Sequence, residues 1–183
     1  MMWAERMRKL WQSAASRRRA LIYRLLGMRI DGRVWLAAIE WPLRPSCIIL
    51  ANGAALDRGV TLLATNNAAR IVIGESCYVN RYTMLDASAL IEIGAQTMIG
   101  PFCYITDHDH VFGPGAAPGE TPLVSKPTKI GQRCWLGAHV SVLKGVTIGD
   151  GTVVGAGSVV TKSLPSGVVA AGSPAKVLRE ITS

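Results

Sequence analysis

The 183-residue chain is poor in aromatic side chains, which make up 6% of its residues and include only two Phe. Nearly half of the residues are nevertheless apolar. A core must therefore be built from small stacked aliphatic side chains rather than from rings. The 19 Gly and 9 Pro suit a chain that turns often. The length allows one domain with at most a small appendage.

Long apolar runs and paired cysteines are also missing. No run approaches the roughly 18 residues that cross a membrane, and the N-terminus lacks the uninterrupted apolar core of a signal peptide. No CxxC pair occurs among the four cysteines, Cys47, Cys77, Cys103 and Cys134. We expect them to be small buried hydrophobes in a reducing compartment, which makes the cytoplasm the expected location.

Several motifs of established chemistry are absent. The sequence has no Walker loop, no GxGxxG placed between a strand and a helix, and no evident Ser/His/Asp nucleophile arrangement. A role with nucleic acid would rest on the basic N-terminus alone, because no basic surface interleaved with aromatics is visible. We therefore expect no nucleic-acid partner.

A six-residue period is what the sequence does contain. Aliphatic residues recur at Ile130, Leu136, Val142, Ile148, Val154 and Val160, and Gly follows four of them. The same register occurs over residues 73–85 and 93–105. A period of six fits neither a helix nor a strand and indicates short strands that turn corners in stacked coils. The step from Leu85 to Ile93 is eight residues, which predicts a two-residue irregularity near residues 86–88.

Residues 106–129 interrupt this period with a segment rich in Gly and Pro, which predicts an extruded loop. Two of the three histidines, His108 and His110, lie in it. A His held by a loop beside a rigid wall can take a proton from a hydroxyl near neutral pH. A carboxylate on its other ring nitrogen would fix the tautomer, and the candidates are Asp86, Asp107 and Asp109.

The third histidine, His139, sits in a regular hexad, and we expect it to pack or hydrogen-bond at a coil corner. Two His separated by one residue, with a third elsewhere, leave a zinc site as an alternative. That spacing carries little information, and Cys134 is expected to be buried. We therefore expect no metal.

The N-terminal segment is strongly basic. Residues 1–44 hold ten Lys/Arg against three Asp/Glu, a net +7, whereas the other 139 residues hold ten against nine, a net +1. Periodicity predicts a helix over residues 3–26 that stops at Gly27, followed by an irregular coil up to about Val60. One helix face carries Trp3, Met7, Leu10, Trp11 and Ala14. Two uses of the helix stay open: packing on the body or a neighbouring subunit, or peripheral docking at the anionic inner membrane face.

The stretch WLGAHVSVLKGVTIGDGTVVGAGSVVTKSLPSGVVAAGSPAKVLREI resembles the C-terminal part of hexapeptide-repeat O-acetyltransferases of the maltose and galactoside acetyltransferase type. It looks closest to members that acetylate sugars in surface-polysaccharide pathways. The resemblance covers about residues 71–181 and fails over residues 1–45. It implies a left-handed parallel β-helix, an exception to the usual crossover hand. We expect a basic helical segment and cap over 1–45, the β-helix with its loop over 46–164, and a C-terminal turn and tail over 165–183.

The resemblance also implies a homotrimer with acetyl-CoA in a cleft between neighbouring subunits. A loop His would remove the proton of a sugar hydroxyl, which attacks the thioester directly, without an acyl-enzyme or a metal. A backbone N–H at Ala138 would stabilise the oxyanion. Counting without gaps from Ile93 places the family's His on His110, whereas matching the family's Thr-x-x-His segment to the residues after Thr106 favours His108. Both remain candidates.

The remaining assignments follow from the same resemblance. Asn80 and Asp86 match acceptor contacts of the sugar acetyltransferases. The positions that match the coenzyme path are Ala138, Ala156, Thr161, Lys162, Lys176 and Arg179. Lys176 replaces an Arg and loses its planar fork. Two alternatives are a γ-type carbonic anhydrase-like zinc enzyme, whose expected His-x4-His pair is lacking, and a non-catalytic trimeric scaffold.

Overall fold

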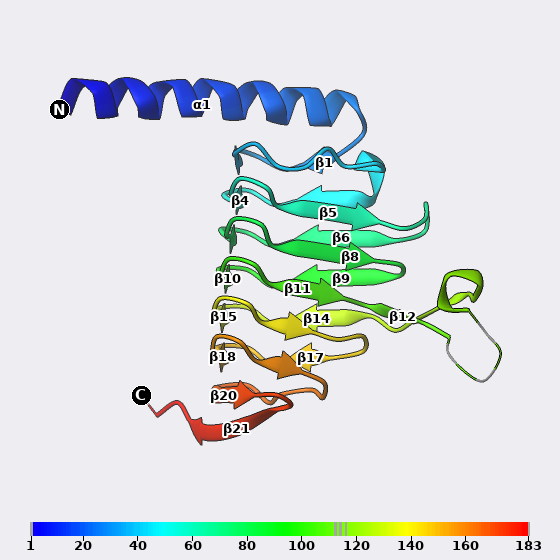
Figure 1. Ribbon diagram of the computed structural model, residues 1–183. Helices are drawn as coiled ribbons and strands as arrows, with labels where there is room; N and C mark the ends of the chain where they lie inside the picture. Colours follow the sequence, from blue (N-terminus) through cyan, green and yellow to red (C-terminus); the bar gives the residue numbers. More distant parts are fainter. Residues whose placement is uncertain (1, 112, 114, 116, 183) are drawn as a thin grey trace.

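In the computed structural model the chain is a solenoid of short parallel strands with one long helix across its first coil (Figure 1). The structure describes residues 2–111, 113, 115 and 117–182, with the side chains of all these except residues 2–12 and Pro118. The predicted face of Trp3, Met7, Leu10 and Trp11 therefore lies outside the described side chains.

Three sheets form the walls of the solenoid. Sheet 1 contains β1 (Arg29–Ile30), β3 (Ile48–Leu50), β6 (Arg70–Ile73), β9 (Leu90–Ile93), β14 (Thr128–Ile130) and β17 (Thr147–Ile148). Sheet 2 contains β2 (Trp35–Leu36), β4 (Ala55–Leu56), β7 (Tyr78–Val79), β10 (Met98–Ile99), β15 (Trp135–Leu136), β18 (Val153–Val154), β20 (Val168–Gly172) and β21 (Ala175–Glu180). Sheet 3 contains β5 (Thr61–Ala64), β8 (Met84–Ala87), β11 (Tyr104–Thr106), β16 (Ser141–Val142) and β19 (Val159–Val160).

The six-residue period fills the core as predicted. Each strand pairs in parallel with the equivalent strand of the next coil, so that Ile93, Ile130 and Ile148 stack in register. At most 2% of each side chain is exposed for the aliphatic residues of the period, Ile130, Leu136, Val142, Ile148, Val154 and Val160. Alternate residues of the parallel strands point inward, and their burial supplies the main stabilising free energy.

The coils wind in the left-handed sense. In Figure 1 the chain passes from β4 along the near wall through β5, returns behind it through β6, and moves one coil away from the helix with each turn. The fold class expected from the family resemblance is confirmed.

The N-terminal end differs from the expectation in where the coils begin. Helix α1 (Met2–Leu25) ends before Gly27, whose φ of +98° suits glycine. Parallel pairing then starts at β1 and β2, well before Val60. Only the third side of this first coil is irregular, because it contains Pro42 and the 3-10 turn η1 (Pro45–Cys47).

The loop leaves the solenoid between β11 and β14. It carries an antiparallel ribbon of β12 (His108–His110) and β13 (Leu123–Ser125) and the 3-10 turn η2 (Pro118–Glu120), and it projects sideways from the coils (Figure 1). At the other end of the chain, the stretch expected as a turn and tail forms β20 and β21, which pair antiparallel. All four cysteines are free and buried, as predicted. Among the described residues, no helix combines the length and apolar character that crossing a bilayer requires.

Candidate functional site

The site is built at one corner of the solenoid, where sheet 3 turns into sheet 1. We call it the loop corner; it comprises residues 65–69, 88–89, 107–111, 117–127, 143–146 and 161–163. The irregularity that the sequence predicted near residues 86–88 is present as two strands of four residues, β8 and β9, joined by a bend at residues 88–89. Three backbone N–H groups at this bend point at one carboxylate, that of Asp107.

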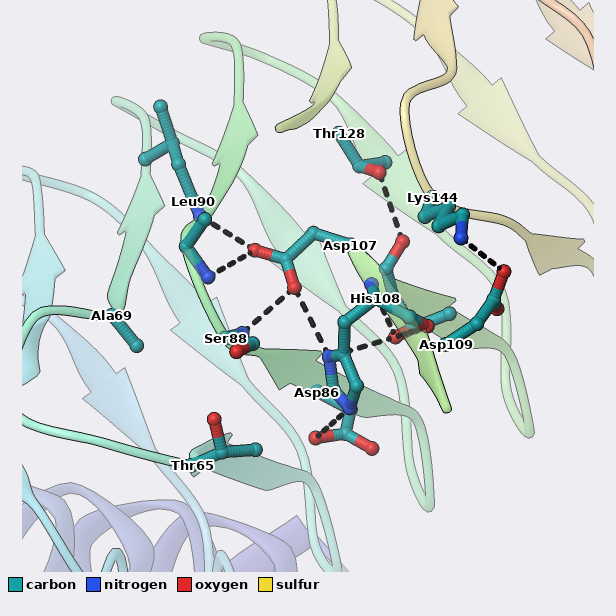
Figure 2. Close-up of polar contacts among 12 residues, drawn as sticks. Thr65, Ala69, Asp86, Ser88, Leu90, Asp107, His108, Asp109, Thr128 and Lys144 are labelled. Atoms are coloured by element: carbon teal, nitrogen blue, oxygen red, sulfur yellow. Dashed lines mark hydrogen bonds and ion pairs between the residues drawn. The ribbon is translucent and has the colours of Figure 1, made fainter. Parts of the chain in front are cut away.

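Asp107 is completely buried and fully used as an acceptor. Its Oδ1 accepts the N–H of Ser88 at 2.7 Å, and its Oδ2 accepts those of Ala89 at 2.7 Å and Leu90 at 2.5 Å (Figure 2). Three donors to a charged carboxylate are strong bonds in a buried setting. They fix the position of this oxygen pair relative to the solenoid wall.

His108 lies against that carboxylate at the first residue of β12. Its Nδ1 is 3.1 Å from Asp107 Oδ1 and 3.3 Å from Thr106 Oγ1. An ionised carboxylate can only accept, so we assign the hydrogen to Nδ1, which leaves Nε2 with a free lone pair. Only 9% of the His108 side chain is exposed. The ring is therefore oriented as a proton acceptor.

The free nitrogen faces a second carboxylate, that of Asp86 on β8. Asp86 Oδ1 lies 3.9 Å from His108 Nε2 and has no hydrogen-bond partner among the described residues, although it is buried. The other oxygen accepts a bond of 3.1 Å from the hydroxyl of Tyr104. Burial raises the pKa of Tyr104, and the nearby Asp86 charge raises it further, so the phenol stays a donor near neutral pH. A buried acceptor without a partner is suited to a bound hydroxyl.

The other loop residues do not join this cluster. Asp109 extends to the far side of the ribbon and pairs with Lys144 at 2.8 Å (Figure 2). His110 is exposed and lies opposite Leu123 in the ribbon. Of the three candidate carboxylates, Asp107 is the one that contacts the ring Nδ1, and Asp86 lies across from the other nitrogen.

A second corner joins sheet 2 to sheet 3. We call it the aromatic corner; it comprises residues 57–60, 80–83, 100–103, 137–140 and 155–158. Tyr82, Phe102 and His139 stack there, one per coil, with centroids 5.3 Å and 5.0 Å apart. All three have φ between +57° and +59°. The expectation that His139 packs at a coil corner is confirmed.

Asn80, Ala138 and Ala156 lie at this aromatic corner. Asn80 is half-buried and its Oδ1 accepts the N–H of Arg81 at 2.8 Å. Register along sheet 2 pairs Leu136 with Val154, so Ala138 and Ala156 occupy equivalent positions in successive coils. Sheet 3 separates them from His108 within one molecule.

The basic candidates lie further toward the C-terminus. Register along sheet 3 aligns Ile105, Val142 and Val160, so Lys144 and Lys162 follow Asp107 down the loop corner. Thr161 and Lys162 are both exposed. Lys176 and Arg179 are exposed on β21. One copy of the chain therefore gathers His108 and Asp86 but distributes the other predicted site residues over two corners and a strand.

Three residues of this neighbourhood were not predicted from the sequence. They are Tyr104, which donates to Asp86; Lys144, which pairs with Asp109; and Thr128, whose hydroxyl donates to the Thr106 carbonyl at 2.8 Å. The hexad register could have placed Lys144 beside the loop. No group of three His, Cys, Asp or Glu suited to a metal ion occurs among the described residues.

Residues 127–162 match the model of the bacterial transferase hexapeptide (six repeats) family. The galactoside O-acetyltransferase of Escherichia coli (strain K12) is 41% identical over 112 residues, which are 61% of this chain and 54% of that protein. WbbJ of the same strain, an inferred lipopolysaccharide biosynthesis O-acetyl transferase, is 39% identical over 118 residues, which are 60% of each chain. The chain thus spans less than two thirds of the length of either curated relative.

The solved structures agree with the coil architecture. A galactoside acetyltransferase in complex with coenzyme A is 28% identical, with a TM-score of 0.67 over 93% of this chain and 72% of that one. Residues 127–162 therefore carry repeats similar to those of this family, and the described solenoid shares its coil architecture with the galactoside enzyme.

Proposed function

We propose that this hexapeptide-repeat chain is an acetyl-CoA-dependent acetyltransferase that acylates a hydroxyl of a sugar, in the synthesis of a surface polysaccharide. The observation that carries the proposal is the buried Asp107–His108 pair beside the unpartnered oxygen of Asp86. The similarity to the galactoside enzyme and to WbbJ supports the sugar class and the pathway. We place the reaction in the cytoplasm, which keeps four free thiols reduced.

We assign the general base to His108 rather than His110. His108 has its Nδ1 on a fixed carboxylate and its Nε2 free, whereas His110 is exposed on the ribbon. Nε2 removes the proton of the acceptor hydroxyl as its oxygen attacks the thioester carbonyl. The C–S bond then breaks, and the coenzyme A sulfur takes up the proton, which leaves an ester and a free thiol. Asp107 stabilises the imidazolium between these steps.

Asp86 is proposed to orient the acceptor. Its Oδ1 lies close enough to Nε2 that adjacent hydroxyls of one sugar ring can reach both groups. One hydroxyl donates to Nε2 and reacts, and its neighbour donates to the carboxylate. The charge of Asp86 also favours the imidazolium that forms during the reaction.

The complete site requires a second copy of the chain. Asn80, Ala138 and Ala156 lie at the aromatic corner, across sheet 3 from His108. A cyclic trimer that sets the aromatic corner of one copy against the loop corner of the next would bring both sets to one cleft. Exposed apolar side chains suit such an interface: Met98 and Trp135 on sheet 2, Phe102 at the aromatic corner and Tyr104 on sheet 3.

In that arrangement the coenzyme follows the loop corner toward the C-terminus. The Ala138 N–H of the neighbouring copy stabilises the oxyanion, and Thr161 and Lys162 line the pantetheine path. Lys176 and Arg179 meet the phosphates as single positive charges. A chain of cations along one direction fits a ligand whose charge lies at the end remote from its thioester.

The test uses the purified full chain, acetyl-CoA and a panel of free and nucleotide-linked sugars. Release of the coenzyme A thiol should depend on one class of sugar, and the product should gain an acetyl group. Mild alkaline hydroxylamine should remove that group, because it cleaves esters and leaves amides. Product resistance to hydroxylamine would mean an amine acceptor. Absence of both thiol release and coenzyme A binding would overturn the proposal.

A further inference from the structure

Helix α1 covers the first coil with one face and leaves the opposite face open. Ser16, Ala20 and Tyr23 are buried against the coil. Two helix side chains bind the backbone of Leu36: its N–H donates to Ser16 Oγ at 2.8 Å, and its carbonyl accepts from the Arg19 guanidinium at 3.2 Å. These contacts fix the rotation of the helix, so its outward face is a defined surface.

That outward face carries apolar side chains around one arginine. Leu21 and Leu25 are 57% and 79% exposed, and Ala14 precedes them at the spacing of the same helical face; the exposed Arg18 lies on this face between Ala14 and Leu21. Beside the helix, Trp41 is 63% exposed and its ring meets Tyr23 edge-on at 5.6 Å; the neighbouring Leu43 is 72% exposed. Figure 1 shows α1 at the N-terminal end of the solenoid, extending past the walls. Exposed apolar side chains thus gather at this end of the solenoid, on the outward face of α1 and on the first coil beside it.

Arginines flank this apolar face. A groove of about 430 Å³ between α1 and the first coil is lined by Arg17, Arg24 and Arg33, together with Ser13, Ser16 and Trp35. Arg24 is held there by bonds to the carbonyls of Ile30 at 3.2 Å and Gly32 at 2.6 Å. None of the described lining residues of this groove carries a carboxylate. The groove offers guanidinium groups without an internal counter-charge.

We propose that α1 and this groove dock the protein on an anionic lipid bilayer. Leu21 and Leu25 enter the boundary between headgroups and acyl chains. Arg17 and Arg33 lie at the flank of the helix, where they meet lipid phosphates in the two-donor geometry that guanidinium allows, and Arg24, held on the coil carbonyls, adds its charge. The net charge of +7 over residues 1–44 adds a long-range attraction to the surface.

The apolar face is opposite the coil, so it points along the solenoid axis. The solenoid then stands on the bilayer at its N-terminal end, and the loop corner faces sideways and stays open to solvent. The alternative occupant of this face, another protein, would require a complementary acidic surface. A bilayer supplies both the apolar layer and the phosphates at the required separation.

The experiment is flotation of the full chain with vesicles. We expect binding to phosphatidylcholine vesicles that contain phosphatidylglycerol, little binding to pure phosphatidylcholine, and weakening as salt rises. Arg17→Gln should weaken binding about fivefold. Leu25→Glu should weaken it more than about tenfold. The matched controls are Arg133→Gln and Leu178→Glu, which change exposed residues away from α1 and should bind as the unaltered chain does.

Point variants are preferable to removal of residues 1–26, because that deletion also strips Ala20 and Tyr23 from the core. Circular dichroism and the thermal midpoint of each variant establish that it is folded. Absence of vesicle binding by the unaltered chain would overturn the proposal, as would equal loss in the controls. Binding that persists in Leu25→Glu, with inorganic phosphate competing it away, would instead identify the groove as a site for a free phosphorylated ligand.

Discussion

His108 Nδ1 lies 3.1 Å from Asp107 Oδ1, and that carboxylate is itself held by the N–H groups of Ser88, Ala89 and Leu90. The imidazole is thus oriented by a carboxylate whose own position is set by the backbone of the previous coil. In the proposed mechanism, this long-range contact between the turn after β8 and the start of the loop favours His108 over His110 as the base.

Replacing each of the two loop histidines in turn tests which of them acts as the base. His108→Asn should lower kcat about 10²- to 10⁴-fold, because it removes the proton acceptor. His110→Asn should stay within about twofold of the unaltered chain, since that ring is exposed on the ribbon. Coenzyme A thiol release at saturating acetyl-CoA measures both. The reverse ranking would move the base to His110.

Asp107 is also expected to contribute to stability. Asp107→Asn weakens three buried charge-assisted hydrogen bonds and should lower the free energy of unfolding by about 1–3 kcal/mol. Asp109→Asn is the matched control, because it breaks only the partly exposed pair with Lys144 and should cost about 0–1 kcal/mol. Urea unfolding followed by circular dichroism compares the two. An equal loss of unfolding free energy in both variants would contradict the inference that the buried hydrogen bonds of Asp107 stabilise the fold.

The proposed trimer makes a prediction for sheet 2. Trp135 is 52% exposed in one copy, next to Met98 in the adjoining strand. Trp135→Glu places a charge in the expected interface and should convert the trimer to monomers. Trp41→Glu changes a tryptophan at the α1 end that is 63% exposed, and it should leave the mass unchanged. Light scattering after size exclusion gives the masses; a trimer that tolerates Trp135→Glu would place the interface elsewhere.

Burial raises the pKa of the thiols of Cys77, Cys103 and Cys134. In the unfolded chain these groups titrate near their ordinary value of 9.0, whereas in the folded chain they keep their protons to higher pH. The unfolded state therefore binds fewer protons above about pH 9, and the free energy of unfolding should fall as pH rises further. Replacing the three by Ala should flatten that slope.

The same thiols should resist modification. Thiolate is the reactive form, and burial suppresses both its formation and its access to reagent. An aromatic disulfide reagent should label them only as fast as the chain unfolds. Rapid labelling of three thiols in the absence of denaturant would show that the coils open locally.

Close contact between coils leaves no room for a side chain at Gly94. A Cβ at Gly94 would lie 2.5 Å from the backbone N of Gln132, whereas one at Gly113 would meet nothing within 4 Å. Gly94→Ala should destabilise the fold by about 1–3 kcal/mol, and Gly113→Ala should be nearly neutral. Thermal midpoints of the two variants test whether coil spacing is as tight as described.

The coils were predictable from sequence because their signal is local and periodic. Ile130 and its successors each occupy the same inward position, and a period of six has no other common use. The extruded loop was equally accessible from its Gly and Pro content. The start of the coils was missed because the six-residue step from Ile30 in β1 to Leu36 in β2 is not repeated: the next position of the period is Pro42.

The proposed preference for His108 over His110 could not be derived from the sequence, since it rests on Asp107 reaching across to residues 88–90. Nothing in the hexad register indicates that the first carboxylate of the loop turns inward while Asp109 turns outward. Asn80 and Ala138 lie at the aromatic corner, whereas His108 lies at the loop corner. This separation results from how the chain winds around the solenoid. Spacing along the chain gives no indication of it.

The two ends of the solenoid have a consequence for how copies of this chain can meet. Stacked parallel coils are open at both ends, and an open end is a template on which another copy could add, coil upon coil, into a fibre. Helix α1 occupies one end, and at the other β21 reverses direction and presents Lys176, Arg179 and Glu180. Growth along the axis is thereby blocked at both ends, and association is directed to the sides, where the loop lies.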